Sequence, residues 1–485
     1  MSILVIDIGS SSVRALLCDE TATPIPGAVA SIPHQARTDS PGEATYDPLE
    51  IRARVEACVD AVMQHPAAAT IEVVGMATLA GNLLGVDHNS QPVTPLYSYA
   101  DTRCAADVAV LRATLPVESI HQRTGCLIHT AYHPARLRWL WRTQPELFRQ
   151  VDQWTDIGTY LYSVWFGDAP CSYSIASWSG LLSRSNLDWY SILLSELRME
   201  EIGLPPLADY GDGVQGLLPD YAGRWPALRE VPFCLAVGDG AAATIGCGCT
   251  DSSRIALSLG TTAALRVVSD DILPDVPEGL WGYLIDARNH LIGGATSEGG
   301  NLFQWAQQTL RLGDDPAALD AALLDRMPDE HGLTVLPLLA GERSPGWSLD
   351  ATGTISGLRL STTPTDILQA LMEAVALRLA LVAEQLGSLA RADAPVIGGG
   401  GALAASTAWP TLLASALDRV VYVTNLQEVT ARGIAVLALR ARGMMTLAAS
   451  PPPITTVFEP DTLAVRALQS ARERQTALYR QIIGG

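Results

Sequence analysis

The sequence predicts an α/β protein with a duplicated nucleotide-binding fold, because one pattern of residues occurs twice. Residues 3–17 read ILVIDIGSSSVRALL, and residues 255–267 read IALSLGTTAALRV. In both, an apolar run leads to a glycine followed by hydroxyl residues, and a second apolar run follows. This pattern is typical of a β-hairpin whose glycine-rich tip lets a ligand approach the backbone. Two such tips that face one another can bind a polyphosphate.

Length and composition support two globular domains. A chain of 485 residues is too long for a single core, so we expect two domains. The chain passes from the first half to the second near 235–250, and we therefore place the domains at 1–240 and 241–485. The contents of 48% hydrophobic and 17% charged residues describe a globular protein with large cores. The net charge of −19 argues against nucleic acid and against anionic membrane surfaces as partners. It is compatible with ATP, since a few arginines, backbone amides and a metal can bind phosphate locally.

The chain contains no lysine, and all 32 of its basic residues are arginine. A Walker A lysine, a Schiff-base lysine and the lysine of protein kinases are therefore excluded. If the protein uses ATP, we expect it to hold the phosphates with amides, hydroxyls and a metal.

The eight cysteines are scattered, and Cys247 and Cys249 form the one close pair. This pair lacks a second pair and a neighbouring histidine, which argues against a zinc site. Buried thiols in a reducing compartment fit better. The N-terminus has no basic region of a signal peptide, and no apolar run reaches the ~20 residues of a membrane helix. We therefore expect a cytoplasmic protein.

The elements of the first half follow from periodicity and from turn residues. We expect a hairpin at 1–20, strand and loop at 24–48, a helix at 48–65, strands at 71–75 and 83–87, and helices at 101–115 and 134–150. Residues 154–235 are mixed. The apolar run 233–237 predicts a short buried strand, which leads through Gly238-Asp239-Gly240 into an alanine-rich helix.

The second half repeats this order of elements. We expect a hairpin at 254–268, a strand at 290–294, helices at 300–312 and 366–389, a strand at 394–397, a helix with Pro410 in its first turn, a strand at 420–423 and a helix at 430–442. Thr363-Pro364-Thr365 is typical of a helix cap before 366.

Five segments, in this order, resemble motifs of the FGGY family of carbohydrate kinases. They are Asp7 to Arg14 (first phosphate motif), Gly238 to Gly246 (catalytic segment), Leu257 to Thr262 (second phosphate motif), Gly398 to Ala402 with Ser406 and Trp409 (adenosine motif), and Glu428 to Gly433 (late helix). Three further segments are most similar to bacterial gluconokinases: Tyr99 to Arg103, Tyr173 to Ser177 and Leu336 to Trp347.

The resemblance implies two actin-like (ribonuclease H-like) domains with a cleft between them. It also implies transfer of the γ-phosphoryl group of ATP to a sugar hydroxyl, with Mg²⁺. ATP is then expected mainly on the second domain and the acceptor mainly on the first. A small sugar or sugar acid is the expected partner, and a homodimer is one option for the assembly.

Two aspartates have candidate catalytic roles. Asp239 follows a strand and precedes a helix, so in isolation it is a helix N-cap candidate. Its flanking glycines and the two hairpins favour a general base that accepts the proton of the attacking hydroxyl. Asp7 ends a buried strand beside a glycine-hydroxyl tip, which suits Mg²⁺ held through waters.

The expected ATP site combines both hairpin tips with the glycine run. The hydroxyl residues can also be plain turn residues, but their duplication favours phosphate contact. The glycine run can also serve helix–strand packing, whereas Trp409 and the helix after it favour a backbone opened for adenine. The candidate residues are Gly9, Ser10, Ser11, Ser12, Arg14, Gly260, Thr261, Thr262, Gly399, Gly400, Gly401 and Ala402.

The expected acceptor site departs from the family at two points. Gluconokinases and xylulokinases usually carry a Met-His pair where this chain has Ala80 and Gly81, and Ser172 stands where an aspartate is expected. A carboxylate of the acceptor would be bound by an arginine, with Arg103 as first candidate and Arg343 as second. The candidate acceptor residues are Ala80, Gly81, Asn82, Asp101, Arg103, Tyr132, His133 and Asp239.

Several functions stay open at this stage. Gluconate is the first acceptor, a pentulose such as xylulose the second, and other polyols follow. A non-catalytic sugar or nucleotide sensor on the same fold is a hypothesis from another class. An actin-like nucleotidase or chaperone-type ATPase is a third, and it would not need the segments 101–103 and 341–347.

Overall fold

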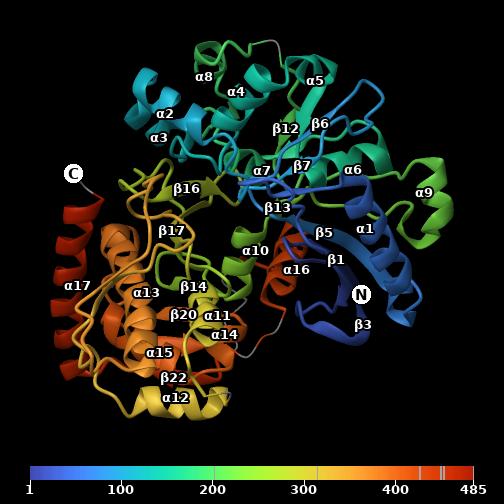
Figure 1. Cartoon of the computed structure of the whole chain (residues 1–485). Coiled ribbons are helices and arrows are strands. Elements are labelled where there is room, and N and C mark those ends of the chain that lie inside the picture. The colour runs from blue at the N-terminus through green and yellow to red at the C-terminus, as the bar shows by residue number, and fades with distance from the viewer. Residues whose placement is uncertain are drawn as a thin grey trace.

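The two glycine-tipped segments form hairpins at the centres of two β-sheets in the computed structural model (Figure 1). The first hairpin consists of β1 (Ser2–Ile8) and β2 (Ser12–Cys18), and the second of β14 (Ile255–Leu259) and β15 (Ala263–Ser269). The structure describes residues 1–483 except 201, 314, 425, 427, 448–450, 452 and 453.

The first sheet has the strand order β13-β5-β1-β2-β3. β3 (Pro24–Pro33) pairs antiparallel with β2, whereas β5 (Ile71–Thr78) runs parallel to β1, and β13 (Val237–Gly238) runs parallel to β5. The apolar side chains of β1 are buried because helices cover both faces of this sheet, and continuous apolar runs are typical of such strands. The covering helices include α1 (Pro48–Val62), α6 (Ile157–Phe166) and α16 (Val429–Ala441).

The second sheet repeats this topology and adds a strand at each edge. Its order is β16-β17-β15-β14-β20-β21-β22, with β14, β20 and β21 parallel and the other pairs antiparallel. The added strands are β16 (Trp281–Leu284) and β22 (Thr456–Phe458), and the others are β17 (His290–Thr296), β20 (Val396–Gly399) and β21 (Val421–Val423). The predicted duplication of an actin-like α/β domain is therefore confirmed.

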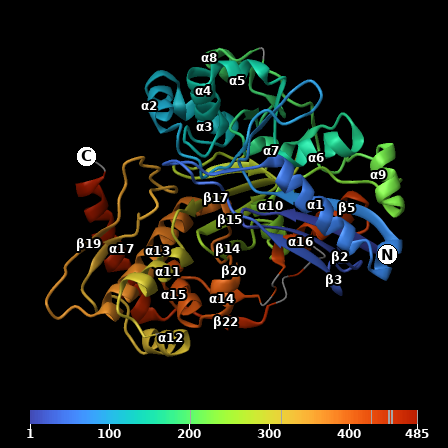
Figure 2. The ribbon, with the colours of Figure 1, turned by 45° about the vertical axis from the view of Figure 1, so that its right-hand side comes forward.

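Two helices lie between the sheets and pack closely against each other. They are α10 (Asp239–Gly246) and α16, and both views place them in this position (Figures 1 and 2). A Cβ atom on Gly433 would overlap the carbonyl oxygen of Ala242, and one on Gly246 would overlap that of Val429. Glycine therefore permits the close approach of the two backbones. α16 comes from the C-terminal half, yet its apolar face packs into the core of the first sheet.

Residues 84–224 form most of a helical lobe above the first sheet in Figure 1. Its helices are α2 (Ala105–Thr114), α3 (Val117–Thr124), α4 (His133–Thr143), α5 (Pro145–Gln150), α7 (Tyr173–Ser177), α8 (Ser191–Glu196) and α9 (Pro219–Arg224). Its short strands pair as β4 (Thr45–Tyr46) with β7 (Leu96–Tyr97), β6 (Leu84–Val86) with β8 (Gln153–Thr155), β9 (Cys171–Ser172) with β12 (Leu207–Ala208), and β10 (Leu182–Ser183) with β11 (Asp188–Trp189).

The second sheet is covered by the long α13 (Pro364–Leu386) and its neighbours. The capping box predicted at the start of α13 is present, because Thr363 Oγ1 accepts from Asp366 N while the Asp366 side chain accepts from Thr363 N. The remaining helices are α11 (Gly300–Thr309), α12 (Pro316–Leu324), α14 (Gly401–Ala404), α15 (Ala408–Leu417) and α17 (Thr462–Ile482). β18 (Thr334–Leu336) pairs with β19 (Thr354–Ser356), and the short 3₁₀ turns are 66–70, 226–228 and 387–389.

Two predicted elements differ from the structure, each for a local reason. The helix expected at 134–150 is divided into α4 and α5, because Pro145 disfavours the helical conformation of Gln144 before it. The strand expected at 233–237 pairs as a ladder only at β13, with Phe233 forming isolated bridges. Among the described helices, none is both long and apolar enough to cross a membrane.

Candidate active site

Strand register brings the two candidate catalytic aspartates to one edge of the first sheet. Asp7 on β1 lies level with Ala77 of β5, and Gly238 on β13 lies level with Thr78. Asp239 directly follows β13, and Ala80 and Gly81 follow β5. Because β1, β5 and β13 are parallel, their carboxyl ends meet at this edge, where ligands bind in open α/β sheets.

Asp239 is the first residue of α10, and Gly238 is the N-cap. No side-chain hydrogen bond caps this helix, and Asp239 Oδ1 accepts from the neighbouring N–H of Gly240 at 2.7 Å. The geometry therefore does not favour a plain capping role. Burial raises the pKa of Asp239, and the Gly240 N–H and Arg266 oppose this effect. A raised pKa suits a group that exchanges a proton during turnover.

Asp7 lies in a strongly acidic environment. Its pKa is raised to about 7, mainly by burial and then by the negative charge of Asp239, whereas Arg14 opposes the increase. Arg14 itself donates from Nη1 to Glu428 Oε2 at 2.8 Å, so its charge is shared between two carboxylates. Asp7 and Asp239 are therefore neighbouring carboxyl groups whose negative charge Arg14 balances only in part.

A cavity of about 120 Å³ opens beside Asp239 and extends between the two sheets. Four of the expected acceptor residues line it: Ala80, Gly81, Tyr132 and Asp239. The second half of the chain contributes as much of the wall as the first, although we expected the acceptor mainly on the first domain. The other lining residues are Tyr99, Ala131, Trp178, Thr262, Ala264, Arg266, Trp281, Tyr283, Ala295 and Arg343.

Stacked aromatic rings form one wall of this acceptor cavity. The ring of Tyr283 stacks on Trp178 with centroids 4.0 Å apart and on Trp281 with centroids 4.3 Å apart. The hydroxyls of Tyr283 and Tyr132 lie 2.6 Å from each other. These contacts join the two halves of the chain across the cavity. The sequence did not indicate Trp281 and Tyr283, because aromatic residues in a buried strand are most often core.

Asn82 and His133 lie behind the acceptor cavity rather than on its wall. Asn82 is buried and bonds to the backbone, donating to Leu79 O at 2.7 Å and accepting from Ile157 N at 2.8 Å. Burial lowers the pKa of His133 to about 3, so its ring is neutral. Gly81 has φ +61°, a conformation that favours glycine. The backbone turn therefore accounts for glycine at this position.

Asp101 and Arg103 pair with each other outside the acceptor cavity. Arg103 donates to both carboxylate oxygens of Asp101, with Nε at 3.1 Å from each and Nη2 at 2.6 Å from Oδ2. Its guanidinium also lies over the ring of Trp139, 4.9 Å from the centroid. Because Asp101 is only 1% exposed, this pair has the character of a structural ion pair.

Arg343, the second candidate for binding a carboxylate, does line the acceptor cavity. Its Nε is buried and has no hydrogen-bond partner within the described part of the chain, and its guanidinium lies 5.5 Å from the centroid of Tyr99. The preceding Glu342 fixes this loop: it forms an ion pair with Arg378 and accepts from Tyr479 Oη at 2.7 Å. Arg343 is thus an anchored cation on the cavity wall.

A second cavity, of about 660 Å³, lies between α10, α16 and the second sheet. Four of the expected ATP residues line it: Arg14, Gly399, Gly400 and Gly401. Ala402 packs against the second core instead. The other lining residues are Ala243, Thr244, Cys247, Ala256, Leu257, Ser258, Arg266, Ala404, Ala405, Leu426, Glu428, Val429 and Thr430.

At both hairpin tips, backbone carbonyls are bound by the protein. Gly9 O accepts from His34 Nε2 at 2.8 Å, and Ser10 O accepts from Tyr46 Oη at 2.8 Å. In the second tip, Gly260 O accepts from Gly300 N at 2.7 Å. Carbonyls held in this way do not turn towards an anion. Ser10, Ser11, Gly260 and Thr261 are exposed, and Ser12 and Thr262 are half-buried.

Gly260 provides a direct test of phosphate contact at the second tip. A Cβ atom built on Gly260 meets no atom of the described residues within 4 Å, so a larger side chain fits the fold and would stand where we expect a phosphate to bind. We expect Gly260→Val to raise the Kd for ATP at least ~10-fold without changing Tm, as measured by calorimetry and thermal melting. Gly223→Val in α9, where a Cβ is also unobstructed, is the matched control. Unchanged ATP affinity in Gly260→Val would remove this tip from the nucleotide site.

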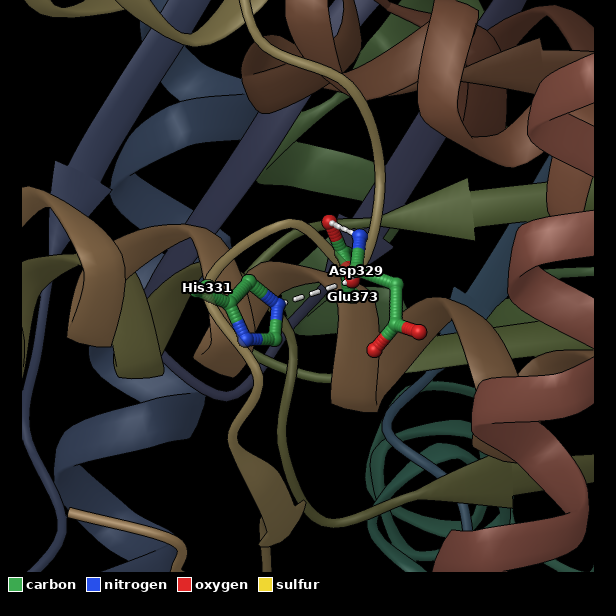
Figure 3. A group of neighbouring side chains, drawn as sticks. All are labelled: Asp329, His331 and Glu373. Atoms are coloured by element: carbon green, nitrogen blue, oxygen red, sulfur yellow. Dashed lines mark hydrogen bonds and ion pairs between the residues drawn. The ribbon is translucent and has the colours of Figure 1, made fainter.

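A separate group of possible metal ligands lies away from the two cavities (Figure 3). His331 Nδ1 accepts from Leu333 N at 2.9 Å, so the ring proton is on Nε2, which lies 3.0 Å from Glu373 Oε2. Asp329 forms an ion pair with Arg474 of α17. These contacts join a loop to two helices, and we interpret the group as a structural network rather than a metal site.

The FGGY family of carbohydrate kinases matches both halves of the chain. The N-terminal domain of the family matches residues 2–246, and the C-terminal domain matches residues 255–442. Gluconokinase of Bacillus subtilis (strain 168) is 26% identical over 449 residues, 90% of this chain and 87% of that protein. Xylulose kinase of Escherichia coli (strain K12) is 27% identical over 492 residues, 99% of this chain and 98% of that protein.

Solved structures show the same fold. A ligand-bound xylulose kinase and a gluconate kinase, both from Lactobacillus acidophilus, each match this chain with a TM-score of 0.92 and 22% identity. Each match covers 99% of this chain and 98% of the other. Because the two family domains together span most of the sequence in the expected order, this chain belongs to the FGGY family of carbohydrate kinases.

Proposed function

We propose that the protein transfers the γ-phosphoryl group of ATP to a hydroxyl of a small sugar acid, with gluconate as the first candidate. Family membership gives the reaction class, a phosphotransferase that uses ATP as phosphate donor. The observation that carries the finer proposal is the acceptor cavity, whose wall combines the carboxylate of Asp239 with the anchored cation of Arg343. A cavity of this kind suits a ligand with one reactive hydroxyl and one carboxylate.

The proposed step is a direct displacement at the γ-phosphorus. The acceptor hydroxyl oxygen forms a bond to the γ-phosphorus, and the bond from that phosphorus to the bridging oxygen breaks, so that ADP leaves with the electron pair. Asp239 accepts the hydroxyl proton, and its raised pKa makes this transfer more favourable than for an ordinary aspartate. We expect the stacked aromatic wall to keep water away from the phosphoryl group, which would limit hydrolysis of ATP in place of transfer.

The residues around Asp7 fit a divalent cation. Asp7 and Asp239 are neighbouring, half-buried carboxyl groups. Desolvation and the charge of Asp239 raise the pKa of Asp7, and a positive charge beside them would remove this repulsion. We propose that Asp7 holds Mg²⁺ through water and that Asp239 faces it from the next parallel strand but one. Bound there, Mg²⁺ would neutralise charge on the ATP phosphates.

The nucleotide site is proposed for the larger cavity and the two hairpin tips. Gly399 to Gly401 leave the backbone open towards this cavity, and Arg14 lies at its first-domain side. Arg14 is paired with Glu428, so we propose that phosphate oxygens replace Glu428 as its partner when ATP binds. We propose that residues 1–240 mainly bind the acceptor and residues 241–485 mainly bind ATP. α16 is an exception to this division of the chain, because it comes from the second part but packs into the first core.

A coupled assay of ADP release tests this function. We expect release from ATP and Mg²⁺ only when an acceptor is present, with gluconate the best of about fifty sugars, polyols and aldonates, and with no transfer in excess EDTA. Turnover of xylulose but not gluconate would contradict the assignment of a sugar acid as acceptor, but it would agree with the assignment as a kinase. ADP release without any acceptor would indicate an ATPase, and no release with any acceptor would indicate a sensor.

A further inference from the structure

Arg266 is the one residue that lines both cavities among the residues that the structure describes. It lies on β15, four residues after Thr262 at the second hairpin tip, and its strand neighbours are Ala256 and Gly293. The nucleotide cavity is on one side of its side chain, and the acceptor cavity with Asp239 is on the other. A phosphoryl group that passes from one cavity to the other therefore passes this guanidinium.

The guanidinium of Arg266 has unused donor capacity. Nη1 donates to Ser258 Oγ at 2.8 Å, whereas Nε is buried and lacks a hydrogen-bond partner in the described structure. Burial lowers the pKa of Arg266, and Asp239 opposes this effect. A buried donor without a partner is costly to the folded protein, and here the free Nε lies where the two cavities meet, so a ligand oxygen can bind it.

Arg266 can take the role that a lysine has in many ATP-dependent enzymes. The chain has no lysine, so no ammonium group can reach the transferring phosphoryl group. Arg343 lines only the acceptor cavity and Arg14 only the nucleotide cavity. A guanidinium at the junction can bind two equatorial phosphoryl oxygens at once.

We infer that Arg266 is a catalytic residue that binds the γ-phosphoryl group during its transfer and stabilises the charge on its oxygens. The inference rests on the proposed kinase function. In the step described above, the bond from the γ-phosphorus to the bridging oxygen breaks as the bond to the acceptor oxygen forms. Arg266 keeps its protons throughout, and Asp239 takes the proton of the hydroxyl. A guanidinium fixed by Ser258 does this without rearrangement.

The test is Arg266→Gln, compared with the wild-type enzyme on the acceptor found by the ADP assay. We expect kcat to fall at least ~10²-fold, while the KM for the acceptor and the Kd for ADP stay within ~3-fold. Removing Arg266 also raises the pKa of Asp239, which moves the acid limb of the kcat profile to higher pH. The comparison is therefore made on the high-pH plateau of each enzyme, where Asp239 is ionised in both.

Arg184→Gln is the matched control. Arg184 is buried, its Nε and Nη1 also lack hydrogen-bond partners in the described structure, and it lines neither cavity. We expect its plateau kcat to stay within ~3-fold of wild type. An equal loss in both variants would show a structural role for Arg266 and overturn the inference. A plateau kcat of Arg266→Gln within ~3-fold of wild type would overturn it too, because Arg266 would then act only on Asp239.

If Arg266→Gln does not fold, Arg266→Lys is measured in its place. Lysine keeps the charge but cannot present two parallel donors, so we expect plateau kcat to fall ~10-fold or more with ADP affinity kept. A lysine variant with wild-type plateau kcat would contradict bidentate contact. Absence of turnover by the wild-type enzyme with every acceptor is a separate result, since it contradicts the kinase proposal itself.

Discussion

Asp239→Asn is expected to lower kcat at least ~10²-fold and to leave ATP binding within a few-fold. Asparagine has the size of aspartate and keeps the contact with Gly240 N, but it cannot accept a proton from the attacking hydroxyl. The measurement is steady-state kcat by ADP release, together with the Kd for ATP by calorimetry. Near wild-type turnover would contradict the assignment of Asp239 as the base.

Asp156→Asn is the matched control for this substitution. Asp156 is also an aspartate at the start of a helix, and desolvation raises its pKa, but it caps α6 by accepting from Gly158 N and Thr159 N. Asparagine is a good N-cap, so we expect turnover within ~3-fold of wild type. A large loss of turnover in both variants would indicate that the enzyme depends on the negative charge of each aspartate, and not on a general base at Asp239.

The pH profile gives a second readout for Asp239. A general base must be ionised, so activity falls as pH decreases through its pKa. Because burial raises that pKa, the acid limb of kcat/KM is expected above the ordinary range of an aspartate. The residual activity of Asp239→Asn should not show this decrease of kcat/KM at low pH. A wild-type profile that is flat down to the ordinary aspartate range would contradict a base at this position.

The fold could be predicted because its signals are local and repeated. Each hairpin is a short apolar run, a glycine tip and a second run, and the predicted catalytic aspartate follows β13, which pairs with β5 in the sheet of the first hairpin. The order of the motifs then fixed the family. The division of the helix at Pro145 also has a local cause, the restriction that a proline places on the residue before it.

The walls of the cavities could not be predicted in the same way, because they depend on contacts between distant segments. Arg103 and Arg343 look equivalent in the sequence. The packing shows that Arg103 pairs with Asp101, whereas Arg343 lines the acceptor cavity. Trp281 and Tyr283 come from an edge strand added to the repeated topology. Arg266 carried one signal that could have identified it, a charged residue within an otherwise apolar strand.

Arg343→Leu is expected to reduce kcat/KM for gluconate by ~2–4 kcal/mol, which is roughly 30- to 1000-fold. The substitution removes the cation on the acceptor-cavity wall and leaves an apolar side chain of smaller size. For the neutral polyol of the same chain length, we expect a loss of less than ~5-fold. The readout is the ratio of the two kcat/KM values, which does not depend on how much enzyme is folded.

Arg103→Leu distinguishes binding of the carboxylate from a general effect of losing an arginine near the site. Its loss leaves Asp101, which is 1% exposed, without its bidentate partner, so the free energy of unfolding should fall by about 3 kcal/mol, as for an uncompensated buried charge. The ratio of gluconate to neutral polyol should stay as in wild type, because the guanidinium of Arg103 does not reach the acceptor cavity. If Arg103→Leu collapses this ratio and Arg343→Leu preserves it, the carboxylate is bound on the first domain, as the sequence alone had suggested. That result would require the loop around Arg103 to release Asp101 when the acceptor enters.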